Sequence, residues 1–391
     1  MSSRPGPWLQ LAALAGAFGA LLAVLSGSLG LGHEYLSAVA VPPLTAVFVA
    51  AWAVHRRLLV PAGAALALFG AAAALTGQGV HLALAASALA AAAVSAVQCF
   101  RGEPVSSGPW RDYLTLTKPR IMSLLLVTGA AGMFVGAHGA PDWGVFATAM
   151  AGLALACGGA SALNHVLDAD IDRLMGKRTE RRPVAAGRVP PARGLEFGLT
   201  LSALSFVLLA STVNVLTATL ALVGNLFYVV VYTRWLKRST SQNIVIGGAA
   251  GAVPPLVGYA AATGNLGLPA LWLFLIVFLW TPPHFWALAL LIKESYAAAK
   301  VPMLPVVKGD DETTRQIVLY SVVMVAFTLV VGFWLGVFYS VAAALLGVVF
   351  LGLAWQLRRQ PTRRNAGVLF HYSLLYLALL FVAAAVDPVI L

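Results

Sequence analysis

The chain has 391 residues, of which 60% are hydrophobic and only 10% are charged, and its mean hydropathy is +0.87. Because a helix needs about 20 apolar residues to cross a bilayer, this composition excludes an ordinary soluble protein and indicates many membrane crossings. The formal net charge of +11 requires no nucleic acid to explain it, since anionic headgroups and an anionic substrate are sufficient partners.

Apolar segments of spanning length recur along the whole chain, and the alternation typical of a β-barrel is absent. We therefore predict an all-α polytopic membrane protein. Thirteen segments fit a helical span: 8–30, 37–54, 59–76, 80–98, 121–138, 144–166, 195–213, 216–233, 243–262, 269–291, 317–337, 340–357 and 367–386.

The placement of charge tests this number independently. If the N-terminus is cytoplasmic, all 25 Lys and Arg residues fall in cytoplasmic segments, and the opposite side carries only Glu34, Asp142 and Asp387. One miscounted span would scramble this distribution, so it supports both the number of spans and their orientation. We expect a multi-pass protein of the bacterial inner membrane.

The chain divides near residue 105. Residues 99–112 are polar and contain two Pro and two Gly, which is linker composition. This linker separates a four-helix membrane extension, residues 1–105, from a nine-span unit, residues 106–391, that carries nearly all of the motifs.

The most informative stretch follows the apolar run that ends at Leu163. Asn164, Asp168 and Asp172 are spaced four residues apart, and each step of four turns only about 40° around a helix, so the three side chains share one face. We name them the polar ladder. Asp170 is out of step and points elsewhere. Amide and carboxylate oxygens grouped in this way suit Mg²⁺.

Cationic residues follow the polar ladder directly, namely Lys177, Arg178, Arg181 and Arg182. Ladder and cations together predict a metal–diphosphate site at a membrane surface. The alternative is a solvated helix end with ordinary positive flanks, but carboxylates so close to a bilayer are costly and argue for function.

Residues 113–391 resemble the UbiA superfamily of membrane prenyltransferases, and within it the branch that farnesylates haem. The ladder carries the superfamily resemblance. The branch is indicated by seven further blocks in order: Tyr113 to Arg120, Asp170 to Met175, Arg178 to Pro183, Tyr232 to Thr240, Asn243 to Pro255, Trp280 to Leu288, and Val301 to Val307.

This resemblance implies a nine-helix prenyltransferase bundle that transfers farnesyl from farnesyl diphosphate to the 2-vinyl group of protohaem IX (haem B), giving haem O and diphosphate. The polar ladder would hold Mg²⁺ and carry catalysis on the cytoplasmic side. Seven residues are expected to contact the diphosphate: Lys118, Arg120, Lys177, Arg178, Arg182, Tyr232 and Lys237.

A second acidic motif is usual in the superfamily, on a later helix end. There the acidic residue directly before the tyrosine is replaced by Ser295 in this chain, while Glu294 remains one position away. Two outcomes follow from this departure. Glu294 rotates in as a further metal ligand, or the second metal site is weaker.

His284 follows two prolines inside an otherwise apolar span, where a kink frees backbone groups and opens a cavity. It is a candidate ligand for haem iron or, alternatively, a partner for a freed carbonyl. Trp280 lies one turn earlier and is expected either to pack on the porphyrin or on neighbouring helices.

The extension 1–105 faintly resembles half of a haem A synthase, with His33 and His81 near helix ends, although Glu34 lacks the histidine expected three residues later. It is either a degenerate haem-handling or docking unit, with haem A synthase as a partner, or a structural extension. Two rival functions stay open for the whole chain: prenyl transfer to an aromatic acceptor such as 4-hydroxybenzoate, and non-catalytic haem binding or transport. The latter gives no reason for the polar ladder.

Overall fold

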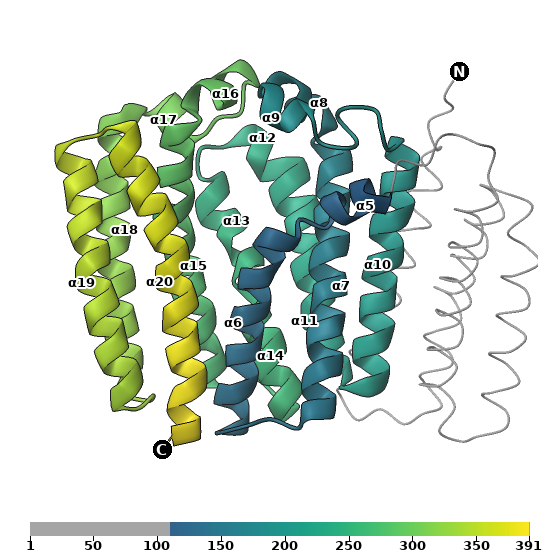
Figure 1. The fold of residues 1–391 in the computed structure, drawn as a ribbon, viewed down its shortest axis with the longest axis vertical. Coiled ribbons are helices and arrows are strands. Elements are labelled where there is room, and N and C mark those ends of the chain that lie inside the picture. Colours follow the sequence, from purple (N-terminus) through teal and green to yellow (C-terminus); the bar gives the residue numbers. More distant parts are fainter. Residues whose placement is uncertain (1–109, 391) are drawn as a thin grey trace, which may run out of the picture. The chain divides into compact units, whose positions relative to one another are not determined.

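A computed structural model describes residues 110–390, apart from the side chain of Arg178, and shows helices and no strand within that range (Figure 1). The four expected spans between residues 8 and 98, the boundary near residue 105 and the histidines of the extension lie outside the described residues. Nine helices of the described part are long and apolar enough to cross a membrane: α6 (Pro119–Ala137), α7 (Trp143–Leu167), α10 (Pro191–Thr212), α11–η2–α12 (Val215–Ser239), α13–α14 (Asn243–Thr263), α15 (Leu268–Leu291), α18 (Gly309–Val331), α19 (Val337–Arg359) and α20 (Arg363–Ile390).

These nine helices confirm the nine spans expected after the linker, mostly to within a few residues. The clearest shift is in α18, which was expected at 317–337 and instead runs from Gly309 to Val331. Its first turn contains Asp310, Asp311 and Glu312, residues that no hydrophobicity pattern assigns to a span. Acidic side chains are favourable there because the N-terminus of a helix carries partial positive charge.

Two spans are interrupted within the bundle. The fourth consists of α11 (Val215–Leu226), the π-helical segment η2 (Phe227–Leu236) and α12 (Lys237–Ser239). The fifth breaks at Ala252 between α13 (Asn243–Gly251) and α14 (Val253–Thr263), because Pro254 and Pro255 lack the backbone N–H groups that would continue the hydrogen bonds of the helix. Such interruptions are tolerated in a membrane where neighbouring helices cover the freed groups.

Close approach between helices relies on glycine. A Cβ added to Gly258 of α14 would lie 1.8 Å from the carbonyl oxygen of Gly129 in α6, and one added to Gly159 of α7 would lie 2.8 Å from that of Gly198 in α10. Membrane helices are drawn together by such backbone contacts, since lipid supplies no hydrophobic force between them.

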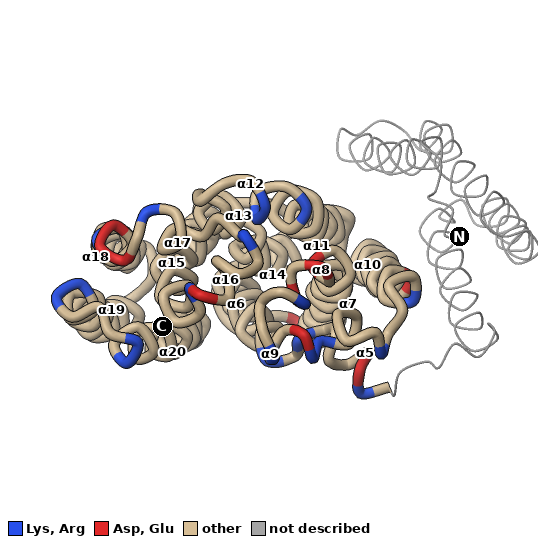
Figure 2. The backbone as a smooth tube through the Cα atoms, turned by 90° about the horizontal axis from the view of Figure 1, so that it is seen from above, with Lys and Arg blue, Asp and Glu red and all other residues tan. Residues whose placement is uncertain are grey.

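The short helices of the described part lie toward the upper end of the bundle in Figure 1: α5 (Trp110–Leu116), α8 (Ala169–Leu174), α9 (Lys177–Glu180), α12 (Lys237–Ser239), α16 (Lys293–Ala298) and α17 (Leu304–Val307). Charged residues of the described part gather over this end when it is viewed from above (Figure 2). The connections at the opposite end, residues 138–142, 213–214, 264–267 and 332–336, contain no Lys or Arg. The charge asymmetry that the sequence predicted is therefore present in the described fold.

Candidate active site

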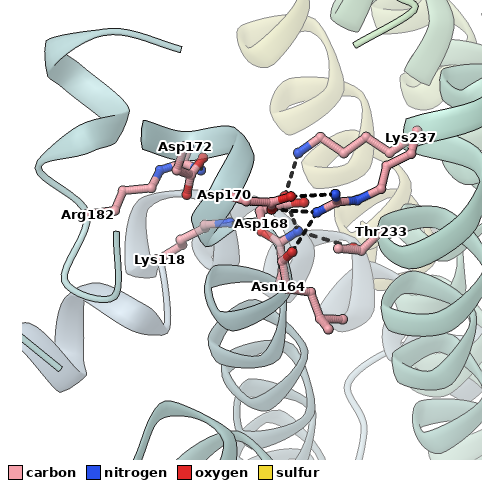
Figure 3. Close-up of polar contacts among 10 residues, drawn as sticks. Lys118, Asn164, Asp168, Asp170, Asp172, Arg182, Thr233 and Lys237 are labelled. Carbon is pink, nitrogen blue, oxygen red and sulfur yellow. Dashed lines mark hydrogen bonds and ion pairs between the residues drawn. The ribbon is translucent and has the colours of Figure 1, made fainter. Parts of the chain in front are cut away.

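The polar ladder forms where α7 gives way to α8. Asn164 lies on the last turn of α7, Asp168 joins the two helices, and Asp172 lies on α8 (Figure 3). Backbone hydrogen bonds run from Asp168 N to Asn164 O at 2.9 Å and from Asp172 N to Asp168 O at 2.8 Å, so helical spacing survives the junction. The three residues are at most 3% exposed. Asn164 Nδ2 donates to Asp168 Oδ2 at 2.8 Å.

Three cationic side chains converge on the ladder from other parts of the chain. Lys118 Nζ donates to Asn164 Oδ1 at 2.7 Å, Lys237 Nζ to Asp168 Oδ2 at 2.5 Å, and Arg182 to Asp172 Oδ1 at 2.6 Å. Lys118 directly precedes α6, Lys237 is the first residue of α12, and Arg182 lies in the loop after α9. Burial, followed by the nearby charge of Arg182, lowers the pKa of Lys118 to about 7.

Two carboxylate oxygens of the ladder are left without a partner. Asp168 Oδ1 and Asp172 Oδ2 are buried and make no hydrogen bond within the described residues. An unpaired buried carboxylate oxygen is costly. Burial also raises the pKa of Asp172 above its ordinary value, against the opposing effect of Arg182. Two hard oxygens in this state fit Mg²⁺, which keeps few protein ligands and completes its shell with water and phosphate oxygens.

Glu294 lies away from this group in the described fold, so its role as a metal ligand stays a prediction. Its side chain is 84% exposed and pairs with Arg363 of α20 at 2.6 Å. No group of three His, Cys, Asp or Glu side chains that could hold a metal exists among residues 110–390. Glu294 lies in the first turn of α16 and is exposed, whereas Tyr296, two residues later, is buried.

Sequence reasoning missed several groups that the fold brings to the ladder. Thr233 Oγ1 accepts from Asn164 Nδ2 at 3.1 Å. Tyr296 is buried enough to raise its pKa to about 12, with Arg182 and Asp168 among the charges that act on it. His165 is 2% exposed, and neither ring nitrogen has a partner within the described residues. Thr233 and Tyr296 lie far from the ladder in sequence, so spacing alone gives no signal for them.

Tyr232 was expected at the diphosphate and lies on η2 at the same end of the bundle. Its ring stacks on that of Tyr228 with centroids 5.5 Å apart. The two are four residues apart within the π-helical segment, where the extra residue per turn changes which side chains share a face. Tyr232 is partly buried and packs against a buried cluster that includes Ile171, Ile244 and Tyr296.

Other predicted residues are placed differently. Asp170 points away from the ladder, as expected, and binds both terminal nitrogens of Arg238 at 2.7 Å, which lowers its pKa to about 2. Arg120 and Lys177 are exposed, and no hydrogen bond within the described part joins either to the ladder. The side chain of Arg178 lies outside the described residues.

His284 and Trp280 are buried at the contact between α15 and α20. His284 Nδ1 lies 2.6 Å from Ser373 Oγ, and Trp280 Nε1 donates to the carbonyl oxygen of Ser373 at 2.8 Å. The imidazole stacks between the rings of Trp280 and Phe370, at 4.2 and 4.9 Å between centroids. Both residues thus have structural partners in the described fold.

Fold and cluster define a polytopic helical membrane protein with buried carboxylates and cations gathered at one membrane face. More particularly, the chain belongs to the UbiA prenyltransferase family, whose model matches residues 125–381. The family expected from the sequence motifs is thereby confirmed.

Two relatives and one solved structure illustrate the likeness. A protein of Roseiflexus castenholzii named protoheme IX farnesyltransferase is 52% identical over 279 residues, which cover 71% of this chain and 52% of that protein. A Picosynechococcus protein of the same name is 51% identical over 281 residues, covering 71% of this chain and 88% of that one. The chain therefore spans about half the length of the Roseiflexus relative.

A UbiA homologue from Archaeoglobus fulgidus bound to GPP and Mg²⁺ superposes on this chain with a TM-score of 0.54 at 16% identity. The match covers 70% of this chain and 99% of that one, which supports the fold.

Proposed function

We propose that this protein transfers a farnesyl group from farnesyl diphosphate to the 2-vinyl group of haem B, giving haem O. The observation that carries the donor half is the pair of unpartnered oxygens, Asp168 Oδ1 and Asp172 Oδ2, enclosed by Lys118, Lys237 and Arg182. Two carboxylates that each keep one oxygen without a hydrogen-bond donor, beside three cationic side chains, suit a metal-bound polyanion. The shared name of the half-identical relatives supports the haem acceptor.

The chain's own residues act on the diphosphate end of the donor. Asp168 and Asp172 would hold Mg²⁺ through their unpartnered oxygens, and the ion would supply neutralisation of the charge on the departing diphosphate. Lys118, Lys237 and Arg182 are held close to these carboxylates and are placed to bind the remaining diphosphate oxygens as the C1–O bond breaks. Asn164 acts through orientation, since its amide spans Lys118 and Asp168.

The carbon skeleton reacts as an electrophile. Loss of diphosphate leaves an allylic cation at C1 of the farnesyl chain, and the terminal vinyl carbon of haem supplies the electron pair for the new C–C bond. The positive charge moves to the adjacent carbon, where water adds and loses a proton to give the hydroxyethyl group. The surrounding apolar bundle excludes competing water from the first cation.

We place the haem near His284. Because Ser373 Oγ donates to the carbonyl oxygen of Phe370 at 2.7 Å, the proton between His284 Nδ1 and Ser373 Oγ belongs to the imidazole. This tautomer leaves the lone pair on Nε2 for iron, as in metal sites where the second nitrogen is fixed by an outer partner. Trp280 holds the imidazole plane by stacking. We also place the ladder on the cytoplasmic side of a bacterial inner membrane, because Lys and Arg collect at that end.

The direct test is incubation of the purified full chain with haem B, farnesyl diphosphate and Mg²⁺, followed by mass spectrometry for farnesyl hydroxyethyl haem. Parallel reactions with 4-hydroxybenzoate in place of haem, and with EDTA in place of Mg²⁺, identify the acceptor and the metal requirement. Product in the haem reaction alone is the expected result. A prenylated 4-hydroxybenzoate would show that the acceptor is an aromatic acid and not haem. Haem binding without product from either acceptor would refute the proposal that the protein is a transferase.

A further inference from the structure

The segment between α8 and α10, residues 175–190, contains Arg182, which pairs with Asp172. This segment contacts the bundle at several points. Arg173 Nε donates to the carbonyl oxygen of Ala185 at 3.1 Å. Val184 and Val189 are fully buried in a cluster with Leu116 of α5. The loop therefore has an apolar anchor on α5, the short helix that precedes the first span of the described part.

A single guanidinium joins that anchor to the segment next to Arg182. Arg188 Nε and a terminal nitrogen donate to the two oxygens of Asp112 on α5, at 2.9 and 3.0 Å. The same terminal nitrogen donates to the backbone carbonyl of Arg181 at 2.9 Å. Asp112 is only 7% exposed, whereas the Arg188 side chain is 44% exposed, so the carboxylate is shielded from water and the guanidinium is partly hydrated. We name the contact of Asp112, Arg188 and the Arg181 carbonyl the loop clamp.

The loop clamp lies next to Arg182, which determines which oxygen of Asp172 stays free. Arg182 binds Asp172 Oδ1 at 2.6 Å and leaves Asp172 Oδ2 without a partner. Which carboxylate oxygen stays free thus depends on the direction from which the guanidinium arrives. That direction is set by the backbone at residues 181 and 182, and the loop clamp fixes the carbonyl between them. Only the planar fork of arginine reaches both oxygens of Asp112 and the carbonyl together.

We propose that Asp112 and Arg188 are positioning residues, which act through Arg182 to hold Asp172 with one oxygen directed to the metal and diphosphate. This inference rests on the proposed function of the polar ladder. It adds two residues distant from the ladder that control affinity for the farnesyl donor and not for the acceptor. Loss of the loop clamp weakens donor binding because Arg182 and Asp172 must then be ordered at the moment of binding.

The experiment compares Arg188→Lys, Arg188→Gln and Asp112→Asn with wild type in the full-length protein, after a thermal-melt check of folding. Binding of a non-hydrolysable farnesyl diphosphate analogue with Mg²⁺ is measured by calorimetry, and KM is measured separately for farnesyl diphosphate and haem. We expect the Kd and KM of the donor to rise ~10-fold, on the scale of a lost outer-shell contact, with the KM of haem unchanged. Arg188→Lys retains charge and volume, so it keeps the test valid if Arg188→Gln misfolds.

Two controls separate positioning from a general structural role. Arg315→Gln removes an exposed arginine that pairs with Glu312 at the same end of the bundle and should change neither constant. In an Arg182→Gln background, Arg188→Gln should weaken donor binding no further, because the two residues act in series. The positioning role of the loop clamp would be overturned by additive losses of donor affinity in the double variant, by an equal rise in the KM of haem, or by unchanged donor binding in the single variants. Failure of wild type to bind the analogue at all would instead refute the proposed function, and the clamp with it.

Discussion

Asp172→Ala is the substitution that most directly tests the polar ladder. Removing this carboxylate deletes one of two free oxygens assigned to Mg²⁺, so we expect turnover to fall by more than ~100-fold, beyond the range typical of outer-shell contacts. The fold should be little affected. Arg182, the partner of Asp172, is 32% exposed and can rehydrate, and burial already penalises the ionised carboxylate, as its raised pKa indicates. We expect less than about 1 kcal/mol of lost stability.

Asp168→Ala should behave differently in stability, although both carboxylates belong to the ladder. Lys237 is only 8% exposed and depends on Asp168 Oδ2 at 2.5 Å. Deleting Asp168 leaves a buried ammonium without its carboxylate, a loss of about 3–5 kcal/mol. The double variant Asp168→Ala with Lys237→Met removes both charges, so it should recover much of the stability and none of the activity.

The assay pairs initial rates of haem O formation with thermal melts of the same preparations. Asp170→Ala is the matched control, because its carboxylate is 65% exposed, faces Arg238 and takes no part in the ladder; it should cost about 0–1 kcal/mol and retain turnover. Near-normal rates for Asp172→Ala at limiting Mg²⁺ would refute the metal assignment. A loss for Asp170→Ala as deep as for Asp172→Ala would show that another face of the helix is catalytic.

Three further predictions follow. Asn164→Ala should reduce turnover less than Asp172→Ala, because it removes a neutral amide that orients Lys118 and Asp168, and a deeper loss would make Asn164 a principal ligand. His284→Ala should shift the Soret band of the haem-loaded protein and weaken haem binding ~10-fold; an unchanged spectrum and affinity, with only about 1–3 kcal/mol of lost stability, would leave His284 a structural partner of Ser373. A reporter fused after Leu391 should read as non-cytoplasmic. A cytoplasmic signal would mean that the number of spans is wrong by one or another odd number.

The sequence alone determined the features that depend on local periodicity. Apolar length predicted the nine spans of the described part, and the i, i+4, i+8 spacing placed Asn164 and Asp168 within hydrogen-bonding distance. Asp170 was likewise predicted to face away, and it does. These features follow from helix geometry, which is the same wherever the helix lies, so no knowledge of neighbouring segments was needed.

Only the tertiary structure decided which distant side chains meet. Nothing in the local pattern shows that Glu294 pairs with Arg363, 69 residues away, or that Thr233 reaches Asn164 across the same separation. The pairing of Arg188 with Asp112, 76 residues apart, is equally invisible in the sequence. Such contacts depend on how helices pack and on where their ends lie, and a charged residue at a helix end has many oppositely charged candidates within reach. Packing selects one of them. A buried carboxylate such as Asp112 must find a partner, whereas an exposed pair such as Glu294 and Arg363 depends only on where the two helix ends lie.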